Sequence, residues 1–483
     1  MNFTREQKWL GLVFVLTTFI FVLQHVNQGS WDFHAYVLNS EYWFHRGSYF
    51  EPFRPPLTAF VVGLLGLILP RLAAEYAFIV LVSLLFGYGT VRFARAAKLN
   101  PVWFYLISSN AYLLLVGLVD GSELLTFALL ELFVASLIEN RDSGGYLGLM
   151  SLARYTGFSF VPLLLAHGKV KKIAKNVVFF VLPLVPWFIY NFVKWGNWFT
   201  SIADQYANNI YFRDYMWGPM QLSHFVRVAN VQSVFALVGF GVVVYELFKH
   251  RRQLRKERAN LLVLAVAVLS VYTYGLAPLK LHRYLFNLLL PISYFAYKGV
   301  VQVVTWCERL RIDQKKWVTI FVLVIFALGY VVALSDASIV KFDRARYLRG
   351  IADLKAKEGC AVSSNAWVEL TYYGFAAGDF PRRELLNRSL ERGEIVVLFK
   401  YIGEPQYADD EVFLHEFAVV KQTSEYIILG KGCVKRMPLD ELFVKKVADR
   451  VELLKGERTE ERACHLLFKR EWMAKLCDSI NKR

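Results

Sequence analysis

The chain has 483 residues, of which 56% are hydrophobic, and its formal net charge at pH 7 is +16. The apolar residues form long blocks instead of the short intervals of a soluble core, which is typical of a membrane protein. A charge this positive would favour nucleic-acid binding in a soluble protein, but here lysine and arginine collect in short loops between apolar blocks, where membrane topology accounts for them. We therefore expect a membrane protein without a nucleic-acid partner.

Apolar segments recur along the first two thirds of the chain, and most are long enough to cross about 30 Å of hydrocarbon. We expect an α-helical protein with about eleven crossings. The segments are 9–26, 75–91, 101–119, 122–138, 145–167, 173–193, 231–248, 260–279, 284–305 and 317–335.

Two segments need separate treatment. Residues 57–70 follow Pro55-Pro56 and make roughly 20 Å of helix, which is short for a span, so we expect this segment to lie flat at the membrane interface. Residues 145–167 lie between two basic loops and are interrupted by Arg154-Tyr155-Thr156-Gly157. We expect that segment to cross twice or to turn back as two short helices, with Arg154 facing protein, water or an anion.

Basic loops predict the orientation, because lysine and arginine favour the cytoplasmic side. These loops are 5–8, 92–98, 141, 169–175, 249–258 and 309–316. The N-terminus is then cytoplasmic in a multi-pass protein of the plasma membrane, and the outer loops are 27–72, 120–121, 194–230 and 280–283, together with everything after about 336. Charged residues would gather at this outer face, which is the default place for a site: Asp32, Arg54, Asp120, Glu123, Arg154, Lys280, His282 and Arg283.

The composition becomes mixed and charged after Ser335-Asp336, which predicts two domains, 1–335 in the membrane and 336–483 outside it. Strand-like runs at 360–363, 394–399 and 426–429 alternate with helix-like stretches at 343–358, 381–391 and 438–454. This alternation indicates a small extracytoplasmic α/β domain. Asn387-Arg388-Ser389 is a short sequon on the same side.

Four of the five cysteines lie in the C-terminal domain, and four cysteines allow three pairings. They are Cys360, Cys433, Cys464 and Cys477. Cys360 begins one expected strand and Cys433 follows another, so a bridge between them is favoured in an oxidising compartment, with free buried thiols as the alternative. No CxxC or clustered histidine pattern suggests a metal site, and we expect no metal or other cofactor.

The outer loop 27–72 contains the most informative pattern. Asp32 follows the first helix, Tyr36 comes one helical turn later, Gly47 and Phe50 form a Gly-x-x-Tyr/Phe element, and Arg54-Pro55-Pro56-Leu57 opens the short segment. The loop resembles the first outer loop of the GT-C glycosyltransferases, which take sugars from polyprenyl-phosphate carriers. It is most similar to the polyprenyl-phosphate-mannose mannosyltransferase branches, and similar also to the protein O-mannosyltransferase and lipid A aminoarabinose transferase branch.

Further matches follow in the order that this resemblance implies. The run 148–157 looks like a Gly-Leu-Ala-x-x-Lys-Tyr/Pro-Thr segment with arginine in place of lysine, and Pro186-Trp187 through Phe199 resembles the start of a large outer loop, although Trp198 stands where proline is usual. His282-Arg283-Tyr284 resembles the start of a late helix. The resemblance covers roughly 9–335 as an ordered set, and the C-terminal domain resembles appendages of archaeal members.

The resemblance implies a membrane hexosyltransferase that moves a mannose-like sugar from a polyprenyl- or dolichyl-phosphate carrier to a glycan, lipid or protein acceptor, with inversion and without a metal. Such chemistry needs a carboxylate to take a proton from the acceptor hydroxyl and cations to stabilise the leaving phosphate. Asp32 suits the first role. Arg54, Arg154, Lys280 and Arg283 suit the second, with Tyr36, Asp120, Glu123 and His282 beside them in substrate binding.

Simpler interpretations stand beside these roles. Asp32 and Asp120 are candidates for helix caps, and capping is the leading explanation for Asp120. Arg54 is as well explained as a headgroup anchor, and Arg71 is better explained so. His34 and His282 fit hydrogen-bonded structural residues.

Two other functions also fit a polytopic chain with buried charges. A transporter or lipid flippase is one, although such proteins usually have internal repeats with paired broken helices, and the sequence has no such halves. A non-catalytic assembly or sensor protein whose outer domain binds a ligand is the other.

Overall fold

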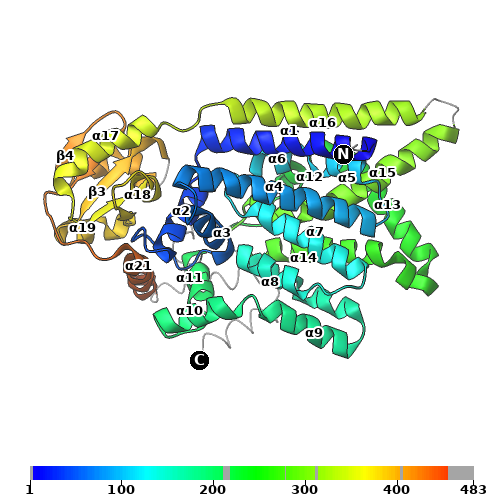
Figure 1. Cartoon of the computed structure of the whole chain (residues 1–483). Helices are drawn as coiled ribbons and strands as arrows, with labels where there is room; N and C mark the ends of the chain where they lie inside the picture. The colour runs from blue at the N-terminus through cyan, green and yellow to red at the C-terminus, as the bar shows by residue number, and fades with distance from the viewer. Residues whose placement is uncertain (1–3, 210–217, 278, 310–313, 403–405, 455–483) are drawn as a thin grey trace.

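The computed structural model describes residues 4–209, 218–277, 279–309, 314–402 and 406–454 (Figure 1). The membrane part contains α1 (Arg5–Gln28), α2 (Trp31–Trp43), α3 (Pro56–Gly66), α4 (Arg71–Ala96), α5 (Pro101–Ser108), α6 (Ala111–Val116), α7 (Glu123–Ile138), α8 (Gly144–Ala153), the 3-10 helix η1 (Tyr155–His167), α9 (Val170–Val181), α10 (Val185–Trp195), α11 (Thr200–Ala207), α12 (Leu222–Ala229), α13 (Ser233–Lys249), α14 (Arg258–Leu276), η6 (His282–Leu288), α15 (Leu289–Arg309) and α16 (Gln314–Ser338).

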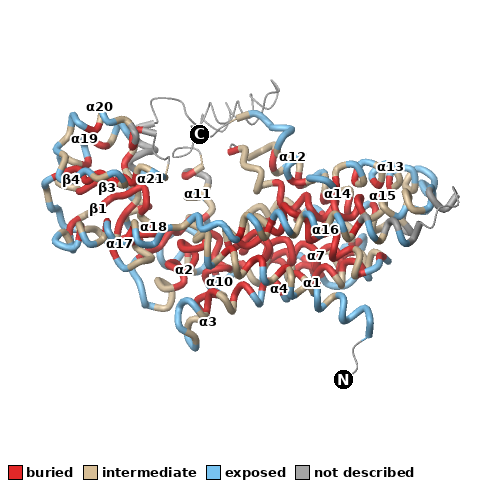
Figure 2. The backbone as a smooth tube through the Cα atoms, turned by 90° about the horizontal axis from the view of Figure 1, so that it is seen from above, coloured by how far each residue is buried: buried red, intermediate tan, exposed pale blue. Residues whose placement is uncertain are grey.

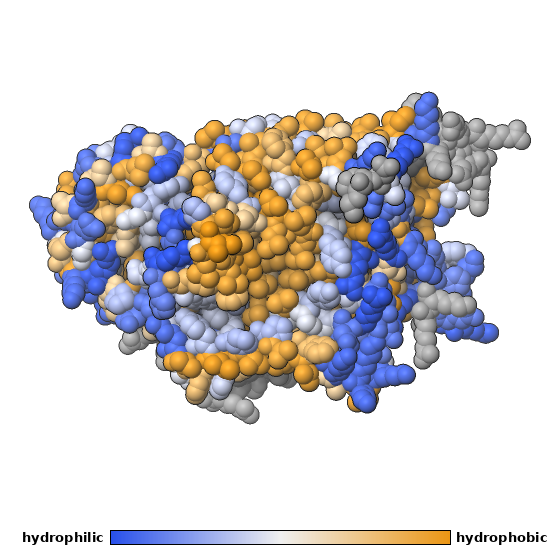
Figure 3. All heavy atoms as spheres, viewed as in Figure 1, coloured by the Kyte–Doolittle hydropathy of each residue, from blue (hydrophilic) through white to orange (hydrophobic). Residues whose placement is uncertain are grey.

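The described helices make this a multi-pass membrane protein. Five are long and apolar enough to cross a membrane, or six if α9 and α10, which meet at a 45° bend, form one span. The space-filling view shows a broad apolar surface between two hydrophilic ends (Figure 3). The expected number of about eleven crossings is not confirmed, because several of the expected segments form shorter or interrupted helices.

The expected continuous helix at 101–119 is wrong. It ends at Ser108, and a new helix, α6, begins at Ala111. The Asn110 side chain accepts a hydrogen bond from the backbone N–H of Leu113 at 2.8 Å, so it caps α6 and breaks the apolar run. α7 lies at the centre of the membrane part and is buried along nearly its whole length (Figure 2).

The segment 145–167 turns back as two short helices, which confirms one of the two alternatives expected for it. At the base of this hairpin, the hydroxyl of Ser143 lies 3.0 Å from Nε2 of His167. Near the tip, Gly157 packs so closely on Ser151 that a Cβ would lie 2.7 Å from the Ser151 backbone. Arg154 connects the two helices in an extended conformation, so its side chain stands at the tip.

The basic loops gather at one end of the helices. Arg95 pairs with Glu6 (3.5 Å), Arg92 with Glu139 (3.2 Å) and Lys175 with Asp142 (2.7 Å). The opposite end joins the C-terminal part of the chain, where Gln28 donates to the backbone carbonyl of Asp336 at 2.6 Å. The loops therefore divide between the two ends as the charge pattern predicts, while the orientation in a membrane stays a prediction.

The C-terminal domain is an α/β domain built on one five-stranded sheet of order β2-β1-β3-β5-β4. The strands are β1 (Val362–Ser364), β2 (Gly378–Asp379), β3 (Ile395–Phe399), β4 (Val419–Gln422) and β5 (Tyr426–Leu429), and its helices are α17 (Arg344–Leu354), α18 (Trp367–Tyr372), α19 (Arg383–Glu391), α20 (Glu411–Leu414) and α21 (Leu439–Leu454). β1 is parallel to both β2 and β3, and β5 is antiparallel to both of its neighbours, β3 and β4. Two short strands, β2 and β4, were not predicted.

Burial on both sheet faces explains the continuous apolar strands. Ile395 and Val397 pack with residues of α17, whereas Val396 and Leu398 pack with Leu386 of α19. A disulfide joins Cys360 to Cys433, which confirms the favoured pairing. Cys464 and Cys477 lie outside the described residues.

Candidate active site

A cavity of about 80 Å³ lies at the end of the membrane part that faces the C-terminal domain. Six segments far apart in the sequence meet there: the start of α2, the loop before α3, the start of α7, the tip of the α8–η1 hairpin, the end of α11 and the start of η6. Seven of the nine predicted site residues line it: Asp32, Tyr36, Arg54, Asp120, Glu123, Arg154 and Arg283.

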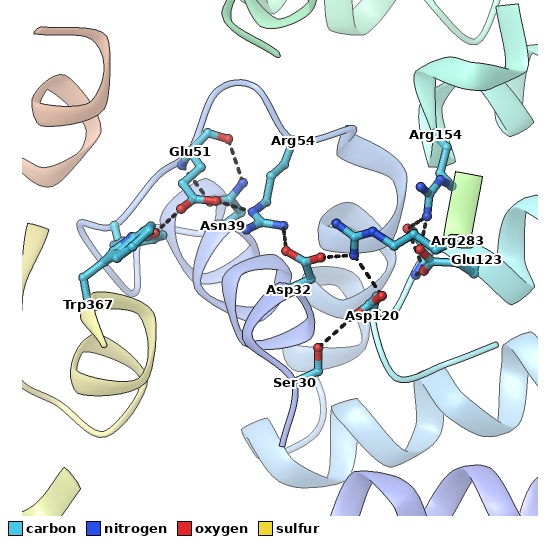
Figure 4. A network of polar contacts seen from close by, with 12 residues as sticks. Ser30, Asp32, Asn39, Glu51, Arg54, Asp120, Glu123, Arg154, Arg283 and Trp367 are labelled. Atoms are coloured by element: carbon cyan, nitrogen blue, oxygen red, sulfur yellow. Dashed lines mark hydrogen bonds and ion pairs between the residues drawn. The ribbon is translucent and has the colours of Figure 1, made fainter. Parts of the chain in front are cut away.

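Asp32 is the centre of this site. Its two carboxylate oxygens accept hydrogen bonds from Arg54 Nη1 at 2.8 Å and from Arg283 Nη1 at 2.5 Å (Figure 4). Asp32 stands in the first turn of α2, and Tyr36 follows one turn later on the same face. The N-cap residue of α2 is Ser30, and its side chain makes no capping bond. The Asp32 carboxylate binds the two guanidinium groups and does not cap the helix.

Asp120 is joined to Asp32 through Arg283. The same Nη1 of Arg283 donates to Asp120 at 2.8 Å, and the hydroxyl of Ser30 donates to the other Asp120 oxygen at 3.2 Å. The capping interpretation of Asp120 is therefore wrong. Its backbone lies before Ser122, the residue at the start of α7, and its carboxylate faces the cavity.

A buried carboxylate fixes the position of Arg54. Glu51 is 2% exposed and accepts hydrogen bonds from Arg54 Nε and from the Tyr49 hydroxyl. Asn39 of α2 holds the Glu51 backbone through two hydrogen bonds of 2.9 and 3.0 Å. Arg54 is 6% exposed, so it is part of the buried network and not a headgroup anchor.

The C-terminal domain reaches the same network. Trp367 of α18 donates its indole N–H to the Tyr49 hydroxyl at 2.6 Å, and Tyr49 donates to Glu51. A continuous chain of polar contacts thus runs from the C-terminal domain through Glu51 and Arg54 to Asp32 (Figure 4). The sequence suggested Glu51 only as a reserve candidate for the base, after Asp32, whereas in the structure its carboxylate binds Arg54 and Tyr49.

Arg154, at the hairpin tip, pairs with Glu123 at the start of α7. The expected pairing with a carboxylate of this face is therefore present. Glu123 is fully buried and the Arg154 side chain is 15% exposed, so one side of the guanidinium remains open to the cavity. The Tyr284 ring lies 6.0 Å from it.

Two predicted residues do not reach the cavity. The Lys280 amine donates to three backbone carbonyls at the end of α14, namely those of Tyr274, Gly275 and Ala277. A lysine in that position satisfies the unpaired carbonyls and the negative end of the helix dipole, which explains why it turns away. His282 Nδ1 bonds to the Tyr112 hydroxyl at 2.8 Å, in agreement with its structural interpretation.

Charge in the site is unevenly balanced. Four carboxylates, those of Glu51, Asp32, Asp120 and Glu123, face three guanidinium groups. Burial would raise the pKa of Asp32, but Arg283 and Arg54 hold it well below its usual range. Burial, together with the charges of Glu123 and Asp32, raises the pKa of Asp120 to about 6 against the lowering effect of Arg283.

Two lining residues belong to a loop in which the sequence singled out no individual residue. Gln205 and Asn208 lie at the end of α11, in the large outer loop. The Gln205 Oε1 atom is buried and has no hydrogen-bond partner among the described residues. A neutral polar acceptor of this kind suits a ligand hydroxyl. Within the described residues, no group of three or more His, Cys, Asp or Glu side chains is arranged to hold a metal ion.

Comparison with known proteins identifies the fold. No protein-family model matches the chain, and no curated protein matches it in sequence. The crystal structure of ArnT from Cupriavidus metallidurans bound to undecaprenyl phosphate is similar, with a TM-score of 0.57, 12% identity, and coverage of 87% of this chain and 97% of that chain. The apo form of ArnT gives a TM-score of 0.52 at 13% identity with the same coverage. The GT-C-like fold predicted from the sequence is thus confirmed.

Proposed function

We propose that the protein is a membrane glycosyltransferase that transfers a monosaccharide from a polyprenyl-phosphate carrier to an acceptor hydroxyl. The observation that carries this proposal is the Asp32–Arg283–Asp120 unit, in which two carboxylates share one guanidinium at a cavity beside two more arginines. Moving a lipid or solute across the membrane does not require a general base, whereas transfer from a phosphate carrier needs both a base and phosphate-binding cations.

The proposed reaction is a single displacement at the anomeric carbon. A carboxylate takes the proton of the acceptor hydroxyl, the acceptor oxygen forms the new bond to the anomeric carbon, and the bond to the carrier phosphate breaks with its electron pair on the phosphate oxygen. Arg54, Arg154 and Arg283 stabilise that oxygen anion by charge-assisted hydrogen bonds. Because acceptor and leaving group lie on opposite sides, the anomeric configuration inverts.

Asp32 is the proposed base. In the resting site its two oxygens are occupied by guanidinium groups, which makes it a weak base. When the carrier phosphate enters, it competes for Arg54 and Arg283, and Asp32 becomes more basic as these contacts weaken. Asp120 is the alternative base, since its pKa of about 6 lies nearer to neutral pH.

The finer assignments rest on the sequence resemblance. A mannose-like hexose, a dolichyl carrier and an archaeal type of enzyme are proposed on that ground. The unpaired Gln205 oxygen and the Asn208 amide are placed to bind sugar hydroxyls at the cavity wall. The acceptor is a glycan, lipid or protein at the outer face.

The direct test is transfer by the purified protein. Radiolabelled polyprenyl-phosphate mannose, glucose and aminoarabinose are incubated separately with the protein and with membrane extract as a source of acceptor. We expect label to move to an acceptor from at least one donor, and to stay on the carrier with an Asp32→Asn, Asp120→Asn double variant. Absence of transfer from all donors, together with movement of labelled lipid between the leaflets of proteoliposomes, would establish the transporter alternative instead.

The proposed outer location of the site is tested by labelling. Ser389 is 3% exposed, so a cysteine there would not react, whereas Asn387 in the same turn of α19 is exposed. An Asn387→Cys variant in intact cells should react with a membrane-impermeant maleimide, and the parent protein serves as the control for native cysteines. Reaction only after permeabilisation would place the C-terminal domain and the site in the cytoplasm.

A further inference from the structure

A second, larger cavity lies on the opposite side of α2. Its volume is about 680 Å³, and it is bounded by the end of α1, the start of α4, the start of α17 and the end of α18. Figure 1 shows α2 between the C-terminal domain and the ends of α1 and α4. We call this space the interdomain cavity. His34 of α2 lines it, two residues after Asp32 and therefore on the other face of the helix.

The described residues that line the interdomain cavity include two arginines and two histidines but no carboxylate: His25, His34, Arg71 and Arg344. The histidines add no free charge, because His25 is paired with Glu75 at 2.7 Å and burial lowers the pKa of His34 to about 3. Arg344 is exposed, its guanidinium lies 5.2 Å from the centre of the Tyr373 ring, and no described carboxylate forms an ion pair with it. Arg71 is held by Glu41 at 2.5 Å and donates to the carbonyl of Tyr372 at 2.7 Å. One cation is therefore fixed in place and the other is available to an anion.

One residue that lines this cavity also has a buried polar atom without a hydrogen-bond partner among the described residues. His34 is 3% exposed, its ring stacks on Tyr372 at 4.0 Å, and its Nδ1 has no hydrogen-bond partner among the described residues. A buried polar atom left unpaired is costly, so such atoms usually mark a bound water, ion or ligand group. The aromatic rings of Tyr372, Tyr373 and Phe342 supply the remaining wall.

The rim of the cavity is apolar on the side of the membrane helices. Val26, near the end of α1, is 57% exposed, and Leu72, at the start of α4, is 55% exposed. Both helices are long and apolar enough to span a membrane. A ligand with an anionic head and an apolar tail matches this cavity, because its head can contact the basic side chains while its tail lies on the apolar rim.

We propose that the interdomain cavity binds the phosphate headgroup of a membrane lipid. Arg344 provides the available positive charge, Arg71 adds a second guanidinium that Glu41 already holds, His34 contributes to the wall, and the lipid chain passes over Val26 and Leu72. This proposal is independent of sugar transfer. The phosphate belongs either to a glycerophospholipid of the bilayer or to an isoprenoid phosphate, and these two sources share the chemistry that the cavity recognises.

The test measures lipid binding by the full-length protein with native mass spectrometry. Phosphatidylglycerol, undecaprenyl phosphate and phosphatidylcholine are added separately, and the variants are Arg344→Gln, Arg344→Lys and Arg349→Gln. Arg349 is the matched control, because it lies on the same helix, is exposed, and pairs with Glu425 outside the cavity. All three substitutions are at exposed positions of α17, so folding should persist.

We expect Arg344→Gln to weaken the binding of at least one anionic lipid by about fivefold and to remove one bound lipid from the stoichiometry, because one arginine near a membrane surface contributes about this much. Arg344→Lys should retain most of the binding, and phosphatidylcholine should be unaffected. Loss with phosphatidylglycerol alone identifies a bilayer lipid, and loss with undecaprenyl phosphate alone identifies an isoprenoid. Equal binding by Arg344→Gln and Arg349→Gln with every lipid would overturn the proposal.

Discussion

The two faces of α2 lie next to cavities that differ in how their positive charges are paired. On one face, Asp32 pairs with both Arg54 and Arg283, and each guanidinium has a carboxylate partner. On the other face, His34 has an unpaired ring nitrogen and Arg344 has no carboxylate partner among the described residues. Every guanidinium on the first face has a carboxylate partner, whereas Arg344 on the second face has none among the described residues.

This difference has a consequence for binding. An anion that enters the paired site must compete with carboxylates already bound to the arginines, so its binding is linked to rearrangement and to protonation. An anion that enters the interdomain cavity meets a cation that is already free. We therefore expect substitutions on the first face to change turnover strongly, and substitutions on the second face to change lipid binding with little effect on turnover.

The largest expected effect is that of Asp32→Asn. This change keeps the size of the side chain and removes the base, so turnover should fall by about two to four orders of magnitude. Rates are measured with saturating donor, and thermal unfolding checks that the protein is folded. The matched control is Asp343→Asn, an exposed aspartate of the C-terminal domain.

Near-parent turnover by a folded Asp32→Asn protein would assign the base to Asp120. In that case Asp120→Asn should show the large loss instead. A loss in both single variants, similar in size to that of the double variant, would indicate that the two carboxylates act as one unit through Arg283.

A smaller effect concerns pH. Asp120 has a pKa of about 6, raised by burial, so it is mostly ionised above pH 6 and protonated below it. Protonation removes one of the carboxylates that bind Arg283, which frees this cation for the carrier phosphate. The KM for the anionic donor should therefore fall severalfold as the pH decreases from about 7 to 5, measured by initial rates. An Asp120→Asn variant should have a KM that is independent of pH over this range, and the same pH dependence in that variant would contradict the assignment.

Sequence reasoning succeeded where order along the chain carried the information. Asp32, Arg54, Arg154 and Arg283 each stood in an interrupted apolar segment or a charged loop, and an unpaired charge there needs partners at the same membrane face. It failed for Lys280, because nothing in the pattern shows that the amine folds back onto the last turn of its own preceding helix.

The interdomain cavity was beyond prediction for a different reason. Arg71 and Tyr372 are 301 positions apart, and their contact depends on how two domains dock. Helix and strand periodicities describe single elements and contain no information about such docking. The edge strand β4 was missed similarly, since it is largely exposed and lacks the apolar run of β3 and β5.

A similarly limited effect, on kcat, is expected from a substitution at Trp367, which connects the C-terminal domain to the active site. Trp367→Phe keeps the aromatic packing but removes the N–H that bonds to Tyr49, and a single hydrogen bond contributes about 1 kcal/mol, or roughly fivefold. If this bond positions Arg54 through Glu51, kcat should fall by about this factor with little change in the amount of bound donor. Trp306→Phe is the control, since Trp306 is 48% exposed at the other end of the molecule. Equal rates in both variants would show that the domain contact is purely structural.

The smallest expected effect on turnover is that of Arg344→Gln. This variant tests whether the two cavities beside α2 act independently. Arg344 is outside the active-site cavity and belongs to the interdomain cavity, so kcat at saturating donor should stay within about twofold of the parent while anionic lipid binding falls. Rates and lipid binding are measured on the same preparation in mixed micelles, with Arg349→Gln as the reference for a lost surface charge. A loss of turnover as large as that of Asp32→Asn would mean that both cavities serve one substrate, with α2 lying between its parts. Retained turnover with reduced lipid binding would establish two separate anion sites on one helix, one for chemistry and one for the lipid that surrounds it.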